Sequence, residues 1–166
     1  MDTKTLLLGA SIVATGLMSG LWYGWAVSVI PGTRRVADSS YVETMQHINR
    51  AIINPAFIVP FLGIPIVIGA AAVMQFRAGD ARRGWLLAGA AAAYVVGVLG
   101  VTVSQNVPLN DALDAFDLEG SDSQAIRDRR ETYETPWNRW HHARTIGNAV
   151  SFVLACSAAL VAAESD

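Results

Sequence analysis

Four long segments of this 166-residue chain carry no charged side chain, and they cover residues 5–30, 52–76, 84–107 and 145–163. A helix needs about 20 apolar residues to cross the hydrocarbon core of a bilayer. A helix on the surface of a soluble protein would show a polar face, and these segments show no charge on any face. The sequence therefore predicts four transmembrane helices.

The chain between the predicted spans is divided unevenly. A short turn at residues 77–83 joins the second span to the third, whereas longer polar segments follow the first and third spans. An even number of spans places both termini on the side of the short turn and both polar segments, here called the caps, on the other side. We expect one all-α domain, a four-helix transmembrane bundle with the following spans and caps: spans at about 5–30, 52–76, 84–107 and 137–163, caps at about 31–51 and 108–136.

Composition excludes several classes of protein. Hydrophobic residues make up 52% of the chain and charged residues 16%, which is the reverse of a disordered composition. Lys and Arg number 12 against 14 Asp and Glu, so no basic excess indicates a nucleic-acid partner. Cys156 is the one cysteine, which excludes a disulfide scaffold and is most simply a small buried hydrophobe.

The first span is too long for the apolar region of a signal peptide, about 7–15 residues, and we expect it to be retained. It ends in Trp22, Tyr23 and Trp25, aromatics typical of a membrane interface. Three arginines in the short turn favour the cytoplasm for that side, although the caps also carry arginines. We therefore expect a multi-pass protein of the cell membrane with cytoplasmic termini and external caps.

The first cap predicts an amphipathic helix. Ser40-Tyr41-Val42-Glu43 is a capping-box pattern, and the helix should run to about Asn54, where Pro55 stops it. Its polar face would carry Glu43, His47, Arg50 and Asn54, and its apolar face Tyr41, Met45, Ile48 and Ile52. Such a helix could also simply lie on the membrane surface with its charged face in water.

Prolines mark other expected boundaries. Pro60 and Pro65 predict a bend in the second span. The block around Pro108 should end the third helix. After a turn at residues 120–123 we expect a short helix, and Pro136 suits the first turn of the fourth long helix.

A polar stripe enters the last span. Trp137, His141, Arg144, Asn148 and Ser151 follow helical spacing and share one face. Ionisable groups at membrane depth are costly, usually face the bundle interior and are functional candidates. The alternatives are an Arg144 that reaches the interface and an Asn148 that bonds a neighbouring helix.

Polar groups at the cap ends of three spans predict a pocket there. The end of the third span adds Thr102, Gln105, Asn106 and Asn110. The small hydroxyls of the first span, with Met18 and Trp22, are more typical of helix packing, and we leave them outside the site. A largely apolar pocket with a few convergent polar groups suits a lipophilic, aromatic small molecule.

Three blocks of the chain resemble a known family. They are residues 45–50 (MQHINR), 106–110 (NVPLN) and 137–144 (WNRWHHAR). In their order and spacing they are similar to the anthrone-oxygenase-like family of small four-helix membrane proteins, largely a domain of unknown function. The positions that match the family pattern are Asn49, Asn106, Asn110, Trp140 and Arg144.

The resemblance implies a cofactor-free oxygenase, because a deprotonated anthrone can react with dioxygen directly. The protein would supply a base, oxyanion donors and a dry cavity. By that implication His47 or His141 is the base, Arg144, Asn49, Asn106 and Asn110 are donors, and Trp137 and Trp140 stack on the ring. Asn54 and Asn148 complete the expected substrate-binding set. Its partners would be the bilayer and a lipophilic small molecule.

Two other functions stay open. A haem or metal ion could bind His47, His141 and His142, which lie near one membrane end, although no metal-ligand spacing is present. A non-catalytic membrane subunit or scaffold could use the acidic stretch at residues 111–122 for docking, and such a protein would form a homo-oligomer or bind a membrane partner protein.

Overall fold

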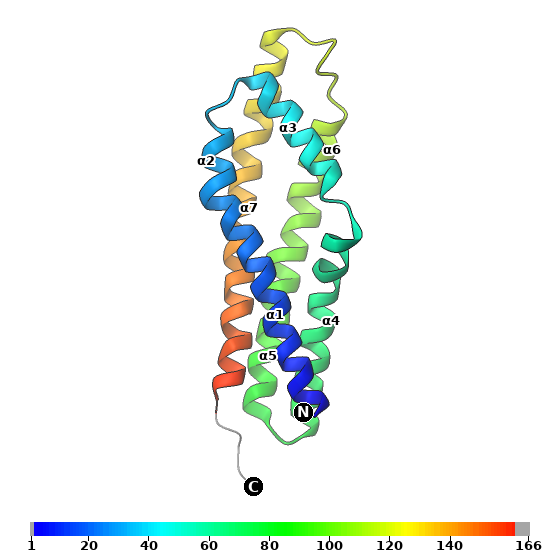
Figure 1. Ribbon diagram of the computed structural model, residues 1–166, viewed down its shortest axis with the longest axis vertical. Coiled ribbons are helices and arrows are strands. Elements are labelled where there is room, and N and C mark those ends of the chain that lie inside the picture. The colour runs from blue at the N-terminus through cyan, green and yellow to red at the C-terminus, as the bar shows by residue number, and fades with distance from the viewer. Residues whose placement is uncertain (1, 162–166) are drawn as a thin grey trace.

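The computed structural model describes residues 2–161, and every regular element in that range is a helix (Figure 1). The helices include three π-helical stretches, labelled η. In chain order they are α1 (Thr3–Gly24), η1 (Trp25–Val29), α2 (Ile30–Thr33), α3 (Asp38–Ala51), α4 (Pro55–Arg77), α5 (Ala81–Tyr94), η2 (Val95–Gly100), η3 (Thr102–Asn106), α6 (Val107–Asp114) and α7 (Ser123–Leu160).

Four helical runs are long and apolar enough to cross a membrane, as the sequence predicts. They are Thr3–Thr33, Pro55–Arg77, Ala81–Asp114 and Ser123–Leu160. In the bundle α1 packs on α4 and α7, and α5 packs on α4 and α7, so the four helices form a ring of neighbours. The start of α1, the turn between α4 and α5 and the end of α7 lie at one end, and both caps lie at the other (Figure 1).

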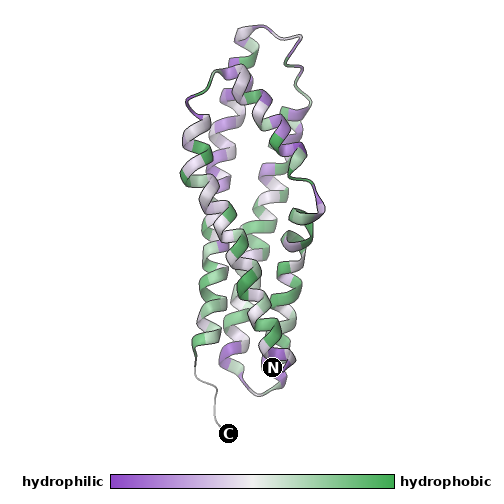
Figure 2. Ribbon diagram, in the orientation of Figure 1, coloured by the Kyte–Doolittle hydropathy of each residue, from purple (hydrophilic) through white to green (hydrophobic). Residues whose placement is uncertain are grey.

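The four-helix part is mostly hydrophobic along its length, and hydrophilic residues gather at the cap end and at the short turn (Figure 2). Leu17, Ile66 and Val96 are each more than 70% exposed. The interior is also apolar, with Ile68 and Leu87 fully buried in one cluster. A bundle with apolar residues on both faces fits a lipid environment.

Two backbones approach closely between η2 and α7. A methyl group built on Gly97 would come 2.9 Å from the Cα of Gly147, and one built on Gly147 would come 2.8 Å from the Cα of Gly97. Small residues let membrane helices approach closely and gain van der Waals contact. These two glycines therefore set the helix spacing just below the level of Arg144.

The cap helix α3 is amphipathic, as predicted, but its apolar face packs against protein. Tyr41, Val42 and Met45 are buried in a cluster with Leu113 and Tyr133 from α6 and α7. Its polar residues Glu43, His47 and Arg50 are exposed. The helix therefore covers the open end of the bundle.

Arg130 on α7 holds the start of α3 in place. Its guanidinium donates to the carboxylates of Asp38 and Glu134 and to the carbonyl oxygens of Val36 and Arg34. The same group lies 4.5 Å from the ring centre of Tyr41, whose pKa is raised chiefly by burial. The contacts with Arg34, Val36 and Asp38 join residues more than ninety positions apart and fix the cap on the bundle.

Two helix boundaries differ from prediction. The helix α3 begins at Asp38, with Ala37 at its N-cap, rather than at the capping box. The acidic side chain of Asp38 in the first turn interacts favourably with the positive end of the helix dipole. It also ends at Ala51 rather than near Asn54, because Asn54 takes an extended conformation and caps α4 by accepting from the Phe57 N–H. The residue before a proline favours that conformation.

Two prolines lie within continuous helical runs, where the sequence predicts a helix end at Pro108 and a helix start at Pro136. The third long helix continues past Pro108 to Asp114, because Pro108 falls in the first turn of α6, just after the wide turns of η3. Pro136 lies inside α7, which is one helix from Ser123 to Leu160 and not a short helix followed by a long one. Packing of the Tyr133 and Trp137 face keeps the helical path through this proline.

Candidate functional site

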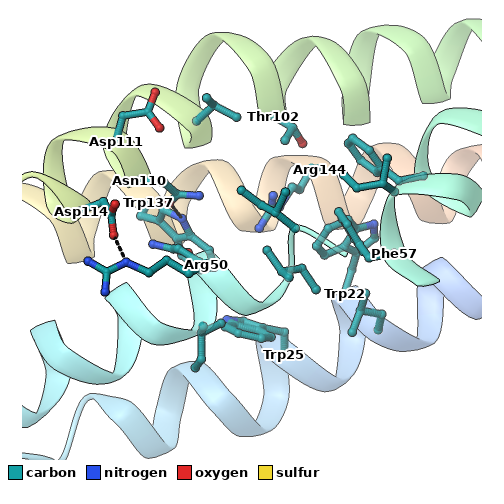
Figure 3. Close-up of a pocket in the computed structure, with 18 residues that line it drawn as sticks. Trp22, Trp25, Arg50, Phe57, Thr102, Asn110, Asp111, Asp114, Trp137 and Arg144 are labelled. Atoms are coloured by element: carbon teal, nitrogen blue, oxygen red, sulfur yellow. Dashed lines mark hydrogen bonds and ion pairs between the residues drawn. The ribbon is translucent and has the colours of Figure 1, made fainter. Parts of the chain in front are cut away.

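A cavity of about 300 Å³ lies where the bundle meets the cap (Figure 3). Its walls come from α1, η1, α3, α4, η3, α6 and α7, together with the α3–α4 link. Its lining residues are Leu21, Trp22, Trp25, Ile48, Asn49, Arg50, Ile52, Ile53, Phe57, Ile58, Phe61, Thr102, Val107, Asn110, Asp111, Asp114, Trp137 and Arg144. The lining is mostly apolar and aromatic, with a few polar groups, as small-molecule sites usually are.

Two π-helical stretches contribute to this wall. Trp25 opens η1, and Thr102 opens η3. A π turn widens the helix locally and re-aims the side chains around it, and such turns are frequent at functional sites. Both stretches lie at the level where the bundle gives way to the cap.

Arg144 is the buried charge of the cavity. It is 6% exposed, and its guanidinium carbon lies 4.2 Å from the ring centre of Trp22 and 5.2 Å from that of Trp137. No carboxylate within residues 2–161 forms an ion pair with it. A buried cation without a counter-ion is costly, and cation–π contacts offset only about 2 kcal/mol of that cost. The cavity is therefore a place where an anion would be stabilised.

His141 orients Arg144. A guanidinium only donates, so its Nη2, at 3.1 Å, must donate to Nδ1 of His141. The ring proton then lies on Nε2, which donates to the Trp22 carbonyl oxygen at 3.1 Å. The fully buried His141 ring is also stacked on Trp137, with centres 5.2 Å apart. In this arrangement both ring nitrogens are occupied, and neither is free to take a proton.

A chain of hydrogen bonds fixes the amide of Asn110. The indole N–H of Trp137, which only donates, is 2.8 Å from Oδ1 of Asn110. The Tyr133 hydroxyl donates to the same oxygen at 3.0 Å and accepts from the amide of Asn49 at 3.0 Å. Because Oδ1 has two donors, the NH₂ group of Asn110 is left to donate elsewhere, and the residue lines the cavity.

Asp111, Asp114 and Arg50 lie toward one end of the cavity, and Arg144 lies toward the other with Trp22 and Phe57 (Figure 3). Arg50 and Asp114 form an ion pair with a 2.5 Å separation. Asp111 is an exposed residue of the lining, and no hydrogen-bond or ion-pair partner for its carboxylate lies in the described part of the chain. Within residues 2–161, Asp111 is therefore the one lining acid that forms no ion pair.

Three lining residues carry a buried polar atom with no protein partner between residues 2 and 161. These atoms are Trp22 Nε1, Thr102 Oγ1 and Arg144 Nε. Buried polar groups in folded proteins are nearly always hydrogen-bonded, and exceptions indicate a strained, catalytic or ligand-binding site. Their gathering around one cavity supports a binding site there.

Comparison with known proteins gives one match. The model of the anthrone oxygenase family matches residues 54–154, more than half of the chain. The chain belongs to the anthrone oxygenase family. No curated protein and no solved structure matches it. The resemblance read from the three sequence blocks is thereby confirmed.

The matched part of this anthrone oxygenase family member holds only part of the cavity. It includes α4, the third long helix and α7 as far as Leu154. Trp22, Trp25, Asn49 and Arg50 lie outside it, on α1, η1 and α3. The family region therefore holds Arg144 and His141, which orients it, and the first helix and the cap helix complete the walls of the cavity.

The structure brings four of the predicted site residues to the cavity, namely Asn49, Asn110, Trp137 and Arg144. The other six lie elsewhere. His47 is exposed on α3, Asn54 caps α4, and Asn106 donates to the Trp137 carbonyl oxygen. Asn148 donates to Thr15 and Ser19, Trp140 is half-buried beside Arg139, and His141 lies behind Arg144.

Sequence reasoning missed Trp22, Trp25 and Asp111. The two tryptophans were expected at the lipid interface, but Trp22 is 4% exposed and both line the cavity. Helical spacing placed Trp22 on the same face as Ser11 and Thr15, which are fully buried, and this was the available signal. Asp111 follows Pro108 and was expected in a cap loop, whereas α6 carries it to the cavity.

The three histidines proposed to bind a haem or metal ion lie in different environments. His141 is buried with both nitrogens engaged, whereas His47 and His142 are exposed. Within residues 2–161 no three His, Cys, Asp or Glu side chains are grouped closely enough to hold a metal ion.

Proposed function

We propose that this membrane protein is a cofactor-free oxygenase that converts a flat, lipophilic aromatic ketone of the anthrone type into the corresponding quinone. The observation that carries the proposal is the buried Arg144, which faces an apolar cavity with no carboxylate partner in the described chain. Family membership supports the same chemistry.

Arg144 is the group that would bind the oxygen of the deprotonated substrate. Loss of a ring C–H proton gives a carbanion whose charge spreads to the ring oxygen. A pre-oriented cation in a dry site stabilises such a charge without reorganisation. His141 holds the guanidinium, and Trp22 and Trp137 flank it, so that its orientation is set before the substrate binds.

Asp111 is our choice for the proton acceptor. Asp111 lines the cavity as an exposed residue, and its carboxylate has no partner in residues 2–161, whereas Asp114 is paired with Arg50. His47, expected for this role, does not line the cavity, and His141 has no free nitrogen. A general base must reach the proton that it abstracts, and among the three only Asp111 lines the cavity.

The reaction balances with dioxygen as the sole co-reactant. Asp111 takes one proton from the ring CH₂, and the carbanion passes one electron to O₂. The substrate radical and superoxide combine through a new C–O bond. The resulting peroxide takes the proton back from Asp111, and loss of water with the second C–H proton leaves the ketone. One CH₂ and one O₂ thus become one C=O and one H₂O.

The cavity walls suit a flat ring. Trp25 and Trp137 have ring centres 6.0 Å apart, and both line the cavity with Trp22 and Phe57. Aromatic side chains offer stacked and edge contacts to a planar ligand. The volume of about 300 Å³ is at the small end of the range for small-molecule pockets.

We also propose that the protein lies in the cell membrane with its termini in the cytoplasm. The short turn between α4 and α5 lies at the same end as the start of α1 and the end of α7, and Arg77, Arg82 and Arg83 flank it (Figure 1). Positive residues in short loops favour the cytoplasmic side.

Oxygen uptake tests the function. An anthrone is added to the protein in lipid nanodiscs at neutral pH, and uptake is compared with empty nanodiscs and with Arg144→Gln. We expect protein-dependent uptake with quinone formation, and a fall of about 10²–10³ in kcat for Arg144→Gln. Uptake equal to that of empty nanodiscs would refute the oxygenase. Metal analysis of the active sample separates this reaction from the haem or metal alternative.

A further inference from the structure

A second hollow adjoins the cavity on the outer face of the bundle. It has a volume of about 320 Å³ and lies between α1 and α4, beside the link that joins α3 to α4. Its lining residues are Leu17, Met18, Leu21, Ile52, Asn54, Ala56, Phe57 and Pro60. We call it the α1–α4 groove.

The groove and the cavity share a wall made of side chains. Leu21, Ile52 and Phe57 line both spaces. The backbone is not continuous helix here, because α3 ends at Ala51 and α4 begins at Pro55. Side chains change rotamer far more readily than a helix moves, so this wall can open without a change in the fold.

The groove faces the region where lipid chains would lie. Leu17 and Leu21 are 71% and 37% exposed on α1, one of the predicted spans. The polar side chain in the lining, that of Asn54, is used within the protein, since it accepts from the Phe57 N–H and donates to the Ala51 carbonyl oxygen. Among residues 2–161, no free polar group in the groove would recognise a polar ligand. Its occupant is therefore a hydrocarbon chain.

The opposite end of the cavity is polar, with Arg50, Asp111 and Asp114 (Figure 3). A lipophilic molecule that entered there would have to pass the Arg50–Asp114 ion pair. Entry from the α1–α4 groove crosses only apolar side chains. The two ends of the site thus differ in chemistry, and a ligand with a polar ring and an apolar chain matches both.

We propose that the substrate is an anthrone-type ring ketone that carries a hydrocarbon chain, and that it enters from the bilayer through the α1–α4 groove and leaves its chain there while the ring lies against Arg144. This inference rests on the proposed function and narrows its substrate class. The groove is no more apolar than lipid, so binding of the chain there adds little affinity. The chain instead fixes the position of the ring. It keeps the ring at the depth of Arg144 during the reaction.

A photoreactive probe tests where the chain lies. The probe is 1-naphthol with an alkyl chain that ends in a diazirine, and the protein is the full chain in nanodiscs. After illumination, labelled positions are mapped by mass spectrometry. We expect labels on residues 17–21 and 52–60. Labels confined to α3, α6 or the cap segment at residues 115–122 would overturn the inference.

Matched variants test the groove itself. Leu17→Trp fills the groove, and Val13→Trp makes the same change one turn earlier on α1, at a side chain that is 62% exposed and outside the groove. Both positions are exposed on the outer face of α1, so both variants should fold. We expect Leu17→Trp to lower labelling at least fivefold and Val13→Trp to leave it unchanged. Equal labelling in the two variants would overturn the inference.

Unmodified 1-naphthol distinguishes this inference from the proposed function. Trp22, Trp25 and Trp137 line the cavity, so ring binding should quench tryptophan fluorescence. If 1-naphthol quenches wild type more than Arg144→Gln while the chain labels other sites, the chain site is refuted and the ring site stands. If 1-naphthol does not quench wild type at all, both proposals fail.

Discussion

The guanidinium carbon of Arg144 lies 4.2 Å from the ring centre of Trp22, although the two residues are on opposite ends of the chain. The Trp22 carbonyl oxygen also accepts from His141, which in turn accepts from Arg144. The first and last spans therefore hold one cation between them. This relationship places a fixed positive charge at the bottom of an apolar cavity.

Asp111→Asn should lower kcat by about 10²–10⁴, the usual contribution of a general base. The amide keeps the size of the side chain but cannot take a proton. The matched control is Asp128→Asn on α7, an exposed carboxylate far from the cavity lining, which should leave kcat unchanged. Turnover is measured by oxygen uptake with an anthrone, and an unaltered kcat in Asp111→Asn would assign the base elsewhere.

The two histidines expected as bases should behave differently. His47→Gln should keep wild-type turnover, because His47 is exposed and outside the cavity lining. His141→Gln should lower kcat, since it disturbs the contact that orients Arg144. The test is steady-state oxygen uptake by the two variants. Loss of turnover in His47→Gln but not in His141→Gln would identify His47 as the base.

Tyr133→Phe should weaken both folding and substrate binding. The change removes the acceptor of Asn49 and one donor to Asn110, and an unsatisfied buried polar group costs about 1–3 kcal/mol. The control is Tyr94→Phe, which loses one hydrogen bond to the Phe61 carbonyl oxygen outside this network. Both variants should unfold more readily, but only Tyr133→Phe should raise KM. A raised KM in both variants would show that the hydrogen bonds of Tyr133 to Asn49 and Asn110 have no specific role in substrate binding.

Gly97→Ala should destabilise the bundle by about 1–3 kcal/mol, the usual cost of overpacking. The new methyl group would meet the backbone of Gly147 at 2.9 Å, and backbone cannot move aside as a side chain can. Gly69→Ala is the matched control, since a methyl group there meets nothing within 4 Å. Unfolding in detergent compares the two. Equal stability would show that the helices are free to separate.

The fold was predictable where one physical rule dominates. Uncharged runs gave the four spans, and an even number of them gave the shared side of the termini (Figure 1). The stripe from Trp137 to Ser151 was also predictable, because charge and amide groups at membrane depth turn inward, and all five residues are buried.

The helix ends were less predictable because tertiary contacts outweigh local signals. Pro136 and Pro108 are both accommodated within helices whose faces pack on other elements. The extension of α6 beyond Pro108 is what brings Asp111 to the cavity. The proposed proton acceptor could therefore not be found from a pattern that ended the helix at that proline.

The location of the candidate site and the inward position of Arg144 were predictable, but the contacts that its neighbours make with it were not. The sequence shows that His141 and Arg144 share a face, and it does not show that one orients the other. Likewise the partners of Trp22 lie more than a hundred positions away, on α7. Contacts of this range depend on how the spans pack, which periodicity alone does not determine.

An anaerobic titration tests the central claim, that Arg144 stabilises the deprotonated substrate. An anthrone is mixed with the protein in nanodiscs at neutral pH without oxygen, and its absorbance is recorded. We predict that wild type produces the long-wavelength band of the anthrone anion, that Arg144→Gln does not, and that Arg139→Gln, an exposed arginine on the same helix, matches wild type. A bound anthrone that keeps its neutral spectrum in wild type would contradict the claim.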